Sequence, residues 1–264
     1  MIIAGRSVLL TGATGGIGQA IARQLAASGA RLTLTARRAD ILEELAADIG
    51  ATVIAADLAD REGVARLAEQ AGDVDILVAN AALPGSGSLF GFTPEEVDRA
   101  LDVNLRAPVM LTRLLAEGMV ARGGGHLVFI SSMAGRTATG GGSALYSATK
   151  FGLRGFGQSL RTDLRGTGVG VSVVFPGFIR DAGMFHDSGT SLPGYVGTST
   201  PQDVADGVVR AIEHDRGEVD VAPVGIRAGA KFAELSPALS ARLTGLLGGR
   251  RVADDLAAGQ ADKR

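Results

Sequence analysis

The chain has 264 residues, 46% of them hydrophobic, a formal net charge of −2 at pH 7 and no cysteine. This composition can bury a large core, and α/β folds of this length often form one domain. The charge gives no basic field for nucleic acid, and the lack of cysteine excludes disulfide, thiolate and zinc-thiolate chemistry.

Short runs rich in valine, isoleucine and leucine alternate along the chain with longer amphipathic segments. This alternation is typical of βαβ units in a parallel sheet with helices on both faces. Seven strands are predicted, at residues 7–10, 31–36, 52–55, 75–79, 126–130, 169–175 and 218–221. Helices are predicted between them, for example at residues 17–28, 41–49, 94–121, 143–165 and 201–214. The sequence therefore predicts an α/β fold with a seven-stranded parallel sheet.

A glycine-rich motif connects the first predicted strand to the first predicted helix. It reads Thr-Gly-Ala-Thr-Gly-Gly-Ile-Gly at residues 11–18. At such a turn, backbone amides and the positive end of the helix dipole can meet a pyrophosphate. The alternative is a turn that needs glycine only for close helix packing. We favour dinucleotide binding, and the predicted contacts are Gly12, Thr14, Gly15, Gly16, Ile17 and Gly18.

The end of the second predicted strand carries information about which dinucleotide binds. An NAD-selective enzyme would normally have Asp or Glu there, whereas this chain has Ala36, Arg37 and Arg38. A guanidinium can bind a 2′-phosphate with two hydrogen bonds, and a carboxylate would repel it. We therefore expect NADP(H) to be preferred, with NAD(H) also possible. The alternative is that both arginines are solvated charges at the start of the next helix.

The segment Tyr146-Ser-Ala-Thr-Lys150 places a phenol and an ammonium four residues apart on a predicted helix. Positions i and i+4 share a helix face, so Lys150 can favour the phenolate of Tyr146 by charge attraction. This attraction would bring the tyrosine pKa of about 10 nearer to neutrality, and would make the phenol a usable proton donor. A half-buried tyrosine with a hydrated hydroxyl is the alternative. We favour the catalytic interpretation.

With these motifs the chain resembles the short-chain dehydrogenase/reductase family, in its single-domain branch, over nearly all of residues 5–225. The resemblance implies a Rossmann-like, doubly wound sheet and a catalytic set of Asn104, Ser132, Tyr146 and Lys150. It further implies four sets of cofactor contacts. Asp57 and Leu58 would hold the adenine, and Asn80 and Ala81 would lie beside the cofactor. Tyr146 and Lys150 would also contact the cofactor, and Pro176 and Gly177 would contact its nicotinamide end.

The resemblance also assigns roles. Asn104 would kink a helix and hold a water that links Lys150 to solvent, and Ser132 would hydrogen-bond the substrate oxygen. Lys150 would hold the cofactor ribose and lower the pKa of Tyr146. The chain departs from the family where Asp181 replaces a common threonine, so the nicotinamide carboxamide contact is expected from the backbone of Ile179 or from a residue further along.

Residues 178–200 are too long for an ordinary connection and contain five glycines or prolines. We interpret this segment as a lid, with Met184, Phe185, His186 and Tyr195 as candidates to line an apolar substrate pocket. A surface loop that packs one or two apolar side chains is an equally good interpretation.

From Ala228 onward, apolar residues recur at steps of three and four and predict a further amphipathic helix: Phe232, Leu235, Leu239, Leu243 and Leu246. We therefore divide the chain into a dinucleotide-binding and catalytic domain at residues 1–227, which includes the lid, and a helical extension at residues 228–264. The extension could shelter a hydrophobic substrate or touch a membrane surface, but we favour packing on its own fold or on a neighbouring subunit.

The expected reaction is reduction of a ketone or aldehyde by NADPH, or the reverse oxidation, on a medium-sized apolar substrate. A 3-oxoacyl thioester reductase is a second enzyme candidate, although that subgroup often has Val-Asp-Gly-Gly where residues 218–225 read Glu-Val-Asp-Val-Ala-Pro-Val-Gly. A regulator that binds NADP(H) without turnover is the candidate from another class. A sensor needs the glycine motif but not the Asn104, Ser132, Tyr146 and Lys150 set.

Partners and location follow from what the sequence lacks. No apolar run reaches the roughly 18 residues that a membrane-spanning helix needs, and residues 1–6 lack the layout of a signal peptide. Together with the lack of cysteine, this leads us to expect a cytoplasmic protein. We expect no metal site, because the three histidines are scattered along the sequence. By resemblance, residues 94–121 and 143–165 would pair between copies to give a homodimer or homotetramer.

Overall fold

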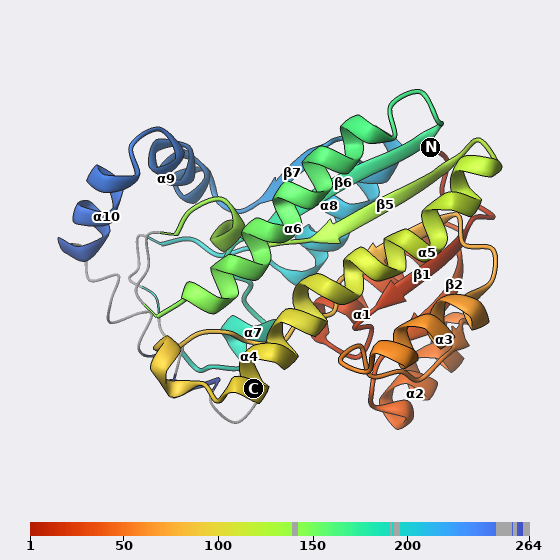
Figure 1. Ribbon diagram of the computed structural model, residues 1–264, viewed down its shortest axis with the longest axis horizontal. Coiled ribbons are helices and arrows are strands. Elements are labelled where there is room, and N and C mark those ends of the chain that lie inside the picture. The colour runs from red at the N-terminus through yellow and green to blue at the C-terminus, as the bar shows by residue number, and fades with distance from the viewer. Residues whose placement is uncertain (139–141, 191, 193–195, 247–254, 256–257, 261–264) are drawn as a thin grey trace.

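The computed structural model describes residues 1–138, 142–190, 192, 196–246, 255 and 258–260. Within these residues, seven strands form one parallel sheet in the order β3-β2-β1-β4-β5-β6-β7 (Figure 1). The strands are β1 (Ser7–Thr11), β2 (Arg31–Thr35), β3 (Thr52–Val53), β4 (Ile76–Ala79), β5 (Gly125–Ile130), β6 (Val169–Pro176) and β7 (Glu218–Val221). The predicted α/β fold class is confirmed.

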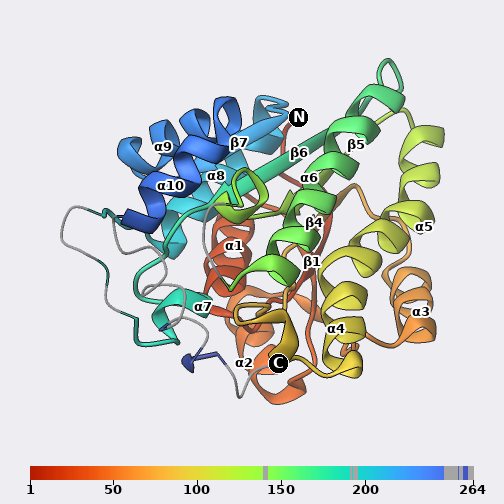
Figure 2. The ribbon, with the colours of Figure 1, turned by 60° about the vertical axis from the view of Figure 1, so that its left-hand side comes forward.

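Helices cover both faces of the sheet, as the two views of the ribbon show (Figures 1 and 2). One face carries α1 (Gly16–Ala27), α2 (Ala39–Ile49) and α8 (Pro201–Glu213). The other face carries α3 (Arg61–Ala71), α5 (Ala107–Ala121) and α6 (Ala144–Asp163). In β1, Val8 and Leu10 pack toward the first set and Leu9 toward the second, because successive side chains of a strand point to opposite faces. Burial on both faces explains why the central strand β4, Ile-Leu-Val-Ala, is apolar throughout.

The strand order reverses between β1 and β4, because β1 pairs with β2 on one side and with β4 on the other. In open parallel sheets, ligands bind outside the carboxyl ends of the strands at such a reversal. The chain leaves β1 at Thr11 and β4 at Ala79. The topology therefore directs the glycine-rich motif and the segment after Ala79 to one crevice.

The helix predicted at residues 94–121 is interrupted. It consists of α4 (Pro94–Leu101), a π-helical turn at Asp102–Arg106 and α5. A π-helical turn widens the backbone spiral locally, and such turns often occur at functional sites. Asn104 lies at the middle of the turn and is buried. The helix is thus irregular at Asn104, where a kink was expected, and takes the form of a π-helical turn.

The segment after β7 differs from the prediction of one amphipathic helix. It forms α9 (Val224–Leu235) and α10 (Pro237–Leu246), because Pro237 cannot continue the preceding helix. The predicted apolar stripe stays largely outside the core, with Leu235 87% exposed and Leu239 46% exposed. Leu114 on α5 and Phe151 on α6 are also partly exposed. Pairing of copies through α5 and α6 stays a prediction.

The lid segment contains one short helix, α7 (Gly183–His186), and a parallel bridge between Ile179 and Ser199. Tyr195, a predicted pocket residue, lies outside the described residues. No helix among the described residues is long and apolar enough to cross a membrane.

His126 lies at the amino end of β5, at the opposite edge of the sheet from the crevice. It is 2% exposed, and its Nε2 lies 2.8 Å from the hydroxyl oxygen of Ser172. Gly170 makes room for the ring, since a Cβ at Gly170 would collide with the imidazole. Burial lowers the pKa of His126 to about 4, although the carboxylate of Asp215 acts in the opposite direction. The folded protein therefore holds this imidazole neutral.

We expect His126 to make the protein less stable in acid. The unfolded chain takes up a proton at this residue below about pH 6.5, which the folded chain resists down to about pH 4. The free energy of unfolding should therefore fall by about 2 kcal/mol between pH 7.5 and pH 5 through this group alone. Denaturant titrations of the wild type and of His126→Gln at both pH values measure the difference. An identical pH dependence in the two proteins would contradict the prediction.

Candidate active site

A cavity of about 650 Å³ lies outside the carboxyl ends of the strands at the order reversal. Most of the predicted cofactor contacts line it together, although they come from four separate segments of the chain. They are Gly12, Thr14, Gly15, Gly16, Ile17, Gly18, Arg37, Arg38, Asp57, Leu58, Asn80 and Ala81. The cavity has the size of a small-molecule or cofactor site.

The glycine-rich motif is packed so tightly that three of its positions have no room for a side chain. A Cβ at Gly12 would lie 2.7 Å from the Ala81 Cα, and Gly12 also has a φ of +68°. A Cβ at Gly18 would collide with the Gly12 carbonyl, and one at Gly16 would collide with Ala182. Helix α1 begins at Gly16, so its free N–H groups face the cavity. The packing and the helix terminus fit a pyrophosphate group.

Thr11 and Asn80 connect the ends of β1 and β4. The Thr11 hydroxyl accepts hydrogen bonds from the backbone N–H of Asn80 and of Ala81, at 3.0 and 3.1 Å. The Asn80 amide donates to the carbonyls of Thr11 and Gly12, both at 3.1 Å. Asn80 thus fixes the start of the glycine motif from the neighbouring strand.

Three arginines line the cavity where the adenosine half of a dinucleotide would lie. Arg37 and Arg38 are exposed, and Arg38 Nη2 donates to the Thr14 carbonyl at 3.3 Å. Arg99, from α4, donates to the Asp57 carboxylate at 3.0 Å. Partial burial acts to raise the pKa of Asp57, but the Ala59 backbone N–H, Arg99 and Arg37 outweigh it, and the pKa is lowered.

The predicted catalytic side chains meet where β5 ends and α6 begins. Ser132 follows β5, and Tyr146 and Lys150 lie one turn apart on α6. The Ser132 hydroxyl hydrogen-bonds the Tyr146 phenol. The Lys150 Nζ lies 5.5 Å from the Tyr146 ring centroid and donates to the Ile130 carbonyl at 2.9 Å. The Ser132 hydroxyl, the Tyr146 phenol and the Lys150 ammonium therefore lie close together.

Burial controls the ionisation of this group. It raises the pKa of Tyr146 to about 12, and the Ser132 hydrogen bond only partly opposes the rise. Burial also lowers the pKa of Lys150 to about 8. The sequence led us to expect a lowered pKa at Tyr146. The structure differs because removal of the phenol from water outweighs the attraction of an ammonium that is bound to a backbone carbonyl.

Asn104 holds the segment after β4 in place. Its side-chain oxygen accepts from the Leu83 N–H at 2.6 Å, and its side-chain nitrogen donates to the Leu83 carbonyl at 2.9 Å. Gly85, two residues further, packs so closely on Tyr146 that a Cβ would lie 2.9 Å from the Tyr146 backbone nitrogen.

Pro176 and Gly177 lie at the carboxyl end of β6, and the Gly177 N–H donates to the Val221 carbonyl at 2.9 Å. The bridge to Ser199 uses the carbonyl of Phe178 and the N–H of Arg180. The backbone groups of Ile179 take no part in those two hydrogen bonds. This arrangement agrees with the expected role of Ile179 and does not test it.

The lid lies against the glycine motif. Ala182 touches Gly16, and Gly183, Met184 and Asp187 line the cavity. Phe185 packs on Phe178 with ring centroids 5.1 Å apart. His186, by contrast, is exposed beside Asp187. Phe185 is thus partly buried and His186 is not, which separates two of the residues proposed for the pocket.

Sequence reasoning missed several residues of the cavity. Thr11 does not line the cavity, but its hydroxyl binds the segment after β4; its position directly before the first glycine was an available signal. Arg99, on α4, and Val103, in the π-helical turn, carried no local signal, because only the tertiary fold brings them to the cavity. Asp187 was missed for the same reason, whereas Met184 was among the predicted lid residues.

Comparisons with known proteins agree with this geometry. Residues 6–193 match the model of the short chain dehydrogenase family. The ketoacyl reductase HetN of Nostoc sp. is 37% identical over 228 residues, 83% of this chain and 79% of that protein. The NADP-dependent 3-hydroxy acid dehydrogenase YdfG of Salmonella typhi is 34% identical over 222 residues, covering 76% of this chain and 86% of that one. A crystal structure of a putative betaketoacyl-ACP reductase superposes with a TM-score of 0.76 at 33% identity, covering 85% of this chain and 99% of that one.

The raised pKa of Tyr146 can be measured directly, because the chain has two tyrosines and no tryptophan. In a Tyr195→Phe variant, Tyr146 is the only tyrosine. Without cofactor, we expect no tyrosinate absorbance from the folded variant below about pH 11, whereas the denatured chain should titrate near pH 10. Tyr146→Phe is the matched control, since it reports Tyr195 alone. A folded Tyr195→Phe protein that titrates at or below pH 10 would show that burial does not dominate.

Proposed function

The chain belongs to the short-chain dehydrogenase/reductase family, oxidoreductases that act on CH–OH and C=O groups, and we propose that it reduces a ketone or aldehyde with NADPH. The observation that carries the proposal is the meeting of Ser132, Tyr146 and Lys150 next to the dinucleotide cavity. The proposed substrate is medium-sized and rather apolar, because the lid beside the site presents Met184 and Phe185.

The cofactor is proposed to lie along the cavity. The glycine motif and the N-terminus of α1 would hold its pyrophosphate, Asp57 and Leu58 its adenine, and Pro176, Gly177 and Ile179 its nicotinamide end. When bound, the reduced nicotinamide supplies a hydride to the carbonyl carbon of the substrate.

The side chains of the site would manage the charge that then develops on the substrate oxygen. Tyr146 gives its proton to that oxygen, and Ser132 donates a hydrogen bond to it. Below pH 8 Lys150 is mostly protonated, so its charge stabilises the tyrosinate that remains. Removal of one preorganised donor to such an oxyanion typically costs about 2.7 to 4 kcal/mol of transition-state stabilisation.

NADP(H) is proposed as the preferred cofactor because Arg37 and Arg38 line the cavity at the end of β2. Both are exposed and can turn toward a 2′-phosphate. One relative is an NADP-dependent 3-hydroxy acid dehydrogenase, which supports the same preference. NAD(H) remains the second candidate.

Two alternatives compete with the general carbonyl reductase. Reduction of a 3-oxoacyl thioester gains support from the relatives named as ketoacyl reductases, although residues 218–225 differ from the pattern of that subgroup. A regulator that binds NADP(H) without turnover is disfavoured, because it would not need Lys150 placed beside the Tyr146 ring.

We expect the wild type to oxidise NADPH in the presence of at least one member of a panel of ketones, aldehydes, quinones and acyl thioesters. Tyr146→Phe should lose at least about a hundredfold in kcat, because the proton donor is absent. The rates of NADPH oxidation with apolar ketones and with acyl thioesters also show which of the two substrate classes is preferred. Cofactor binding by calorimetry without turnover on any carbonyl would instead favour the regulator.

The cofactor preference has a separate test. Arg37→Ala should raise the Kd for NADPH by about tenfold or more, since it removes a charge-assisted contact to the 2′-phosphate, and should leave the Kd for NADH nearly unchanged. Fluorescence titration of both nucleotides measures the ratio, and Arg38→Ala examines the neighbouring arginine. An unchanged preference in the double variant Arg37→Ala, Arg38→Ala would rule out the assignment.

A further inference from the structure

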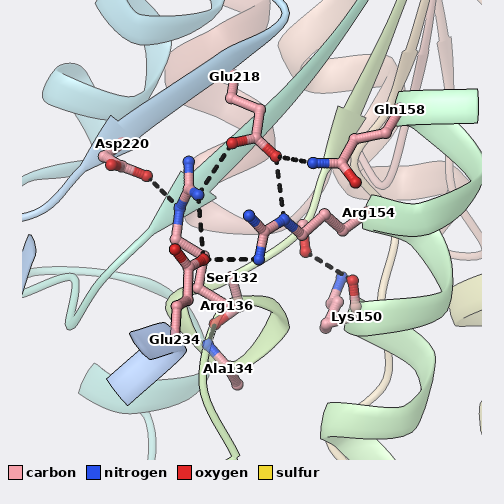
Figure 3. Close-up of polar contacts among 10 residues, drawn as sticks. Ser132, Ala134, Arg136, Lys150, Arg154, Gln158, Glu218, Asp220 and Glu234 are labelled. Carbon is pink, nitrogen blue, oxygen red and sulfur yellow. Dashed lines mark hydrogen bonds and ion pairs between the residues drawn. The ribbon is translucent and has the colours of Figure 1, made fainter. Parts of the chain in front are cut away.

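Behind Ser132 lies a cluster of ion-paired side chains (Figure 3). Arg136 follows the 3₁₀ turn at Met133–Gly135, which begins directly after Ser132. Its Nε donates to the Asp220 carboxylate at 2.5 Å, and its Nη1 lies 2.9 Å from Glu218 and 3.5 Å from Glu234. The Arg136 side chain is only 10% exposed. The three acidic residues come from β7 and α9, whereas Arg136 belongs to the catalytic segment.

The same carboxylates bind a second arginine, on the catalytic helix. Arg154 lies one turn after Lys150 on α6, and its Nε donates to Glu218 at 3.0 Å while its Nη1 donates to Glu234 at 2.7 Å. Gln158 adds a hydrogen bond to Glu218 at 2.8 Å. Glu218 thus holds Arg136 through one oxygen and Arg154 through the other. The two segments that carry Ser132 and Lys150 are tied to a common partner.

Stacking restricts the Arg136 side chain further. Its guanidinium carbon lies 3.9 Å from the centroid of the Phe175 ring, on β6 directly before Pro176. A planar guanidinium can stack on an aromatic ring and bind carboxylates with its edge at the same time, which a lysine ammonium cannot do. Because carboxylates occupy both guanidinium groups, the cluster is not built to bind an anionic part of a substrate.

The other side of the Ser132 segment is held by α6. The Ser131 hydroxyl donates to the Lys150 carbonyl at 3.0 Å, and a Cβ at Gly135 would lie 2.7 Å from that same carbonyl oxygen. Within the turn, the Ser132 hydroxyl accepts from the Ala134 N–H at 3.1 Å. The turn therefore lies between a helix contact at Ser131 and Gly135 and the charge cluster at Arg136.

We propose that Arg136 is a positioning residue, which holds the Ser132 hydroxyl at the Tyr146 phenol by fixing the turn to Glu218 and Asp220. Glu234 brings the C-terminal α9 into the same arrangement. Arg136 acts through Ser132 and contacts neither substrate nor cofactor in this role. The inference rests on the proposed reductase function, because the position of Ser132 matters for catalysis only if Ser132 hydrogen-bonds the substrate oxygen.

The kinetic test is a double-mutant cycle between Arg136→Lys and Ser132→Ala. Arg136→Lys keeps the charge but loses the planar guanidinium, which binds two carboxylates and stacks on Phe175. We therefore expect kcat to fall by roughly tenfold to a hundredfold, and KM to stay within about twofold of the wild-type value. In the Ser132→Ala background the same change should cost less than about twofold in kcat, because the displaced hydroxyl is already absent. Multiplicative losses in the double variant would show that Arg136 does not act through Ser132.

The matched control is Arg161→Lys. Arg161 also binds a carboxylate, Asp215, through two nitrogens, but it does so at the far edge of the sheet near His126. This variant should lose stability and keep kcat at a temperature well below its Tm. An equal loss of kcat in Arg161→Lys would mean that general weakening of the fold explains the effect, and the positioning role would be wrong.

A second measurement does not depend on turnover. Hydrogen exchange of the N–H groups of residues 134–137, which are bonded within the turn, should accelerate in Arg136→Lys and stay unchanged in Arg161→Lys. Unchanged exchange in Arg136→Lys would overturn the proposal even in an active enzyme. Faster exchange in a protein that reduces no carbonyl would leave the anchoring of the turn supported and would reject the reductase function and, with it, the catalytic role of Arg136.

Discussion

Lys150 is 2% exposed, and its ammonium donates to the carbonyl at the end of β5. Among the described residues no carboxylate forms a salt bridge with it, so the protein buries a cation that only dipoles compensate. Such burial is unfavourable for the charged form, and the pKa near 8 reflects this. The same surroundings oppose ionisation of the Tyr146 phenol. The site therefore holds a positive charge next to an acid that stays protonated, which suits it to receive negative charge on a neighbouring oxygen.

The parallel sheet makes this arrangement possible. Ser132 follows β5, Asn80 follows β4, the glycine motif follows β1 and Gly177 follows β6, so each reaches the same edge without a long connection. Cross-links between strand ends then set the fine geometry. Thr11 with Asn80 joins β1 to β4, and Asn104 with Leu83 joins the segment after β4 to the π-helical turn. Helix α6, which carries Tyr146 and Lys150, packs on the π-helical turn.

Local sequence pattern was sufficient for the parts of the structure that depend on local forces. Alternation of apolar and amphipathic runs predicted the strands within a few residues, and glycine spacing predicted the cavity. Contacts between residues far apart in the chain could not be predicted from the local sequence pattern. The approach of Arg99 to Asp57 joins residues 42 positions apart, and that of Arg136 to Asp220 joins residues 84 positions apart. The prediction of a lowered pKa for Tyr146 was wrong for a related reason. Helical spacing reveals the neighbouring lysine, but it does not reveal how far the fold removes the phenol from water. Pro237 was a local signal for the break between α9 and α10, and the apolar periodicity across it obscured the break.

Glu234 connects the two parts of the chain that the sequence analysis separated at residue 227, the catalytic domain and the helical extension. By chain order it belongs to the C-terminal extension, yet its carboxylate lies 2.7 Å from Arg154 Nη1, one helical turn from the catalytic lysine. A protein shortened before α9 would keep both arginines and lose one of the three carboxylates that neutralise them. The local balance of charge behind the active site would then shift from negative toward neutral. In electrostatic terms the extension is not a separable module, and grafting or trimming it would change the field in which the reaction takes place.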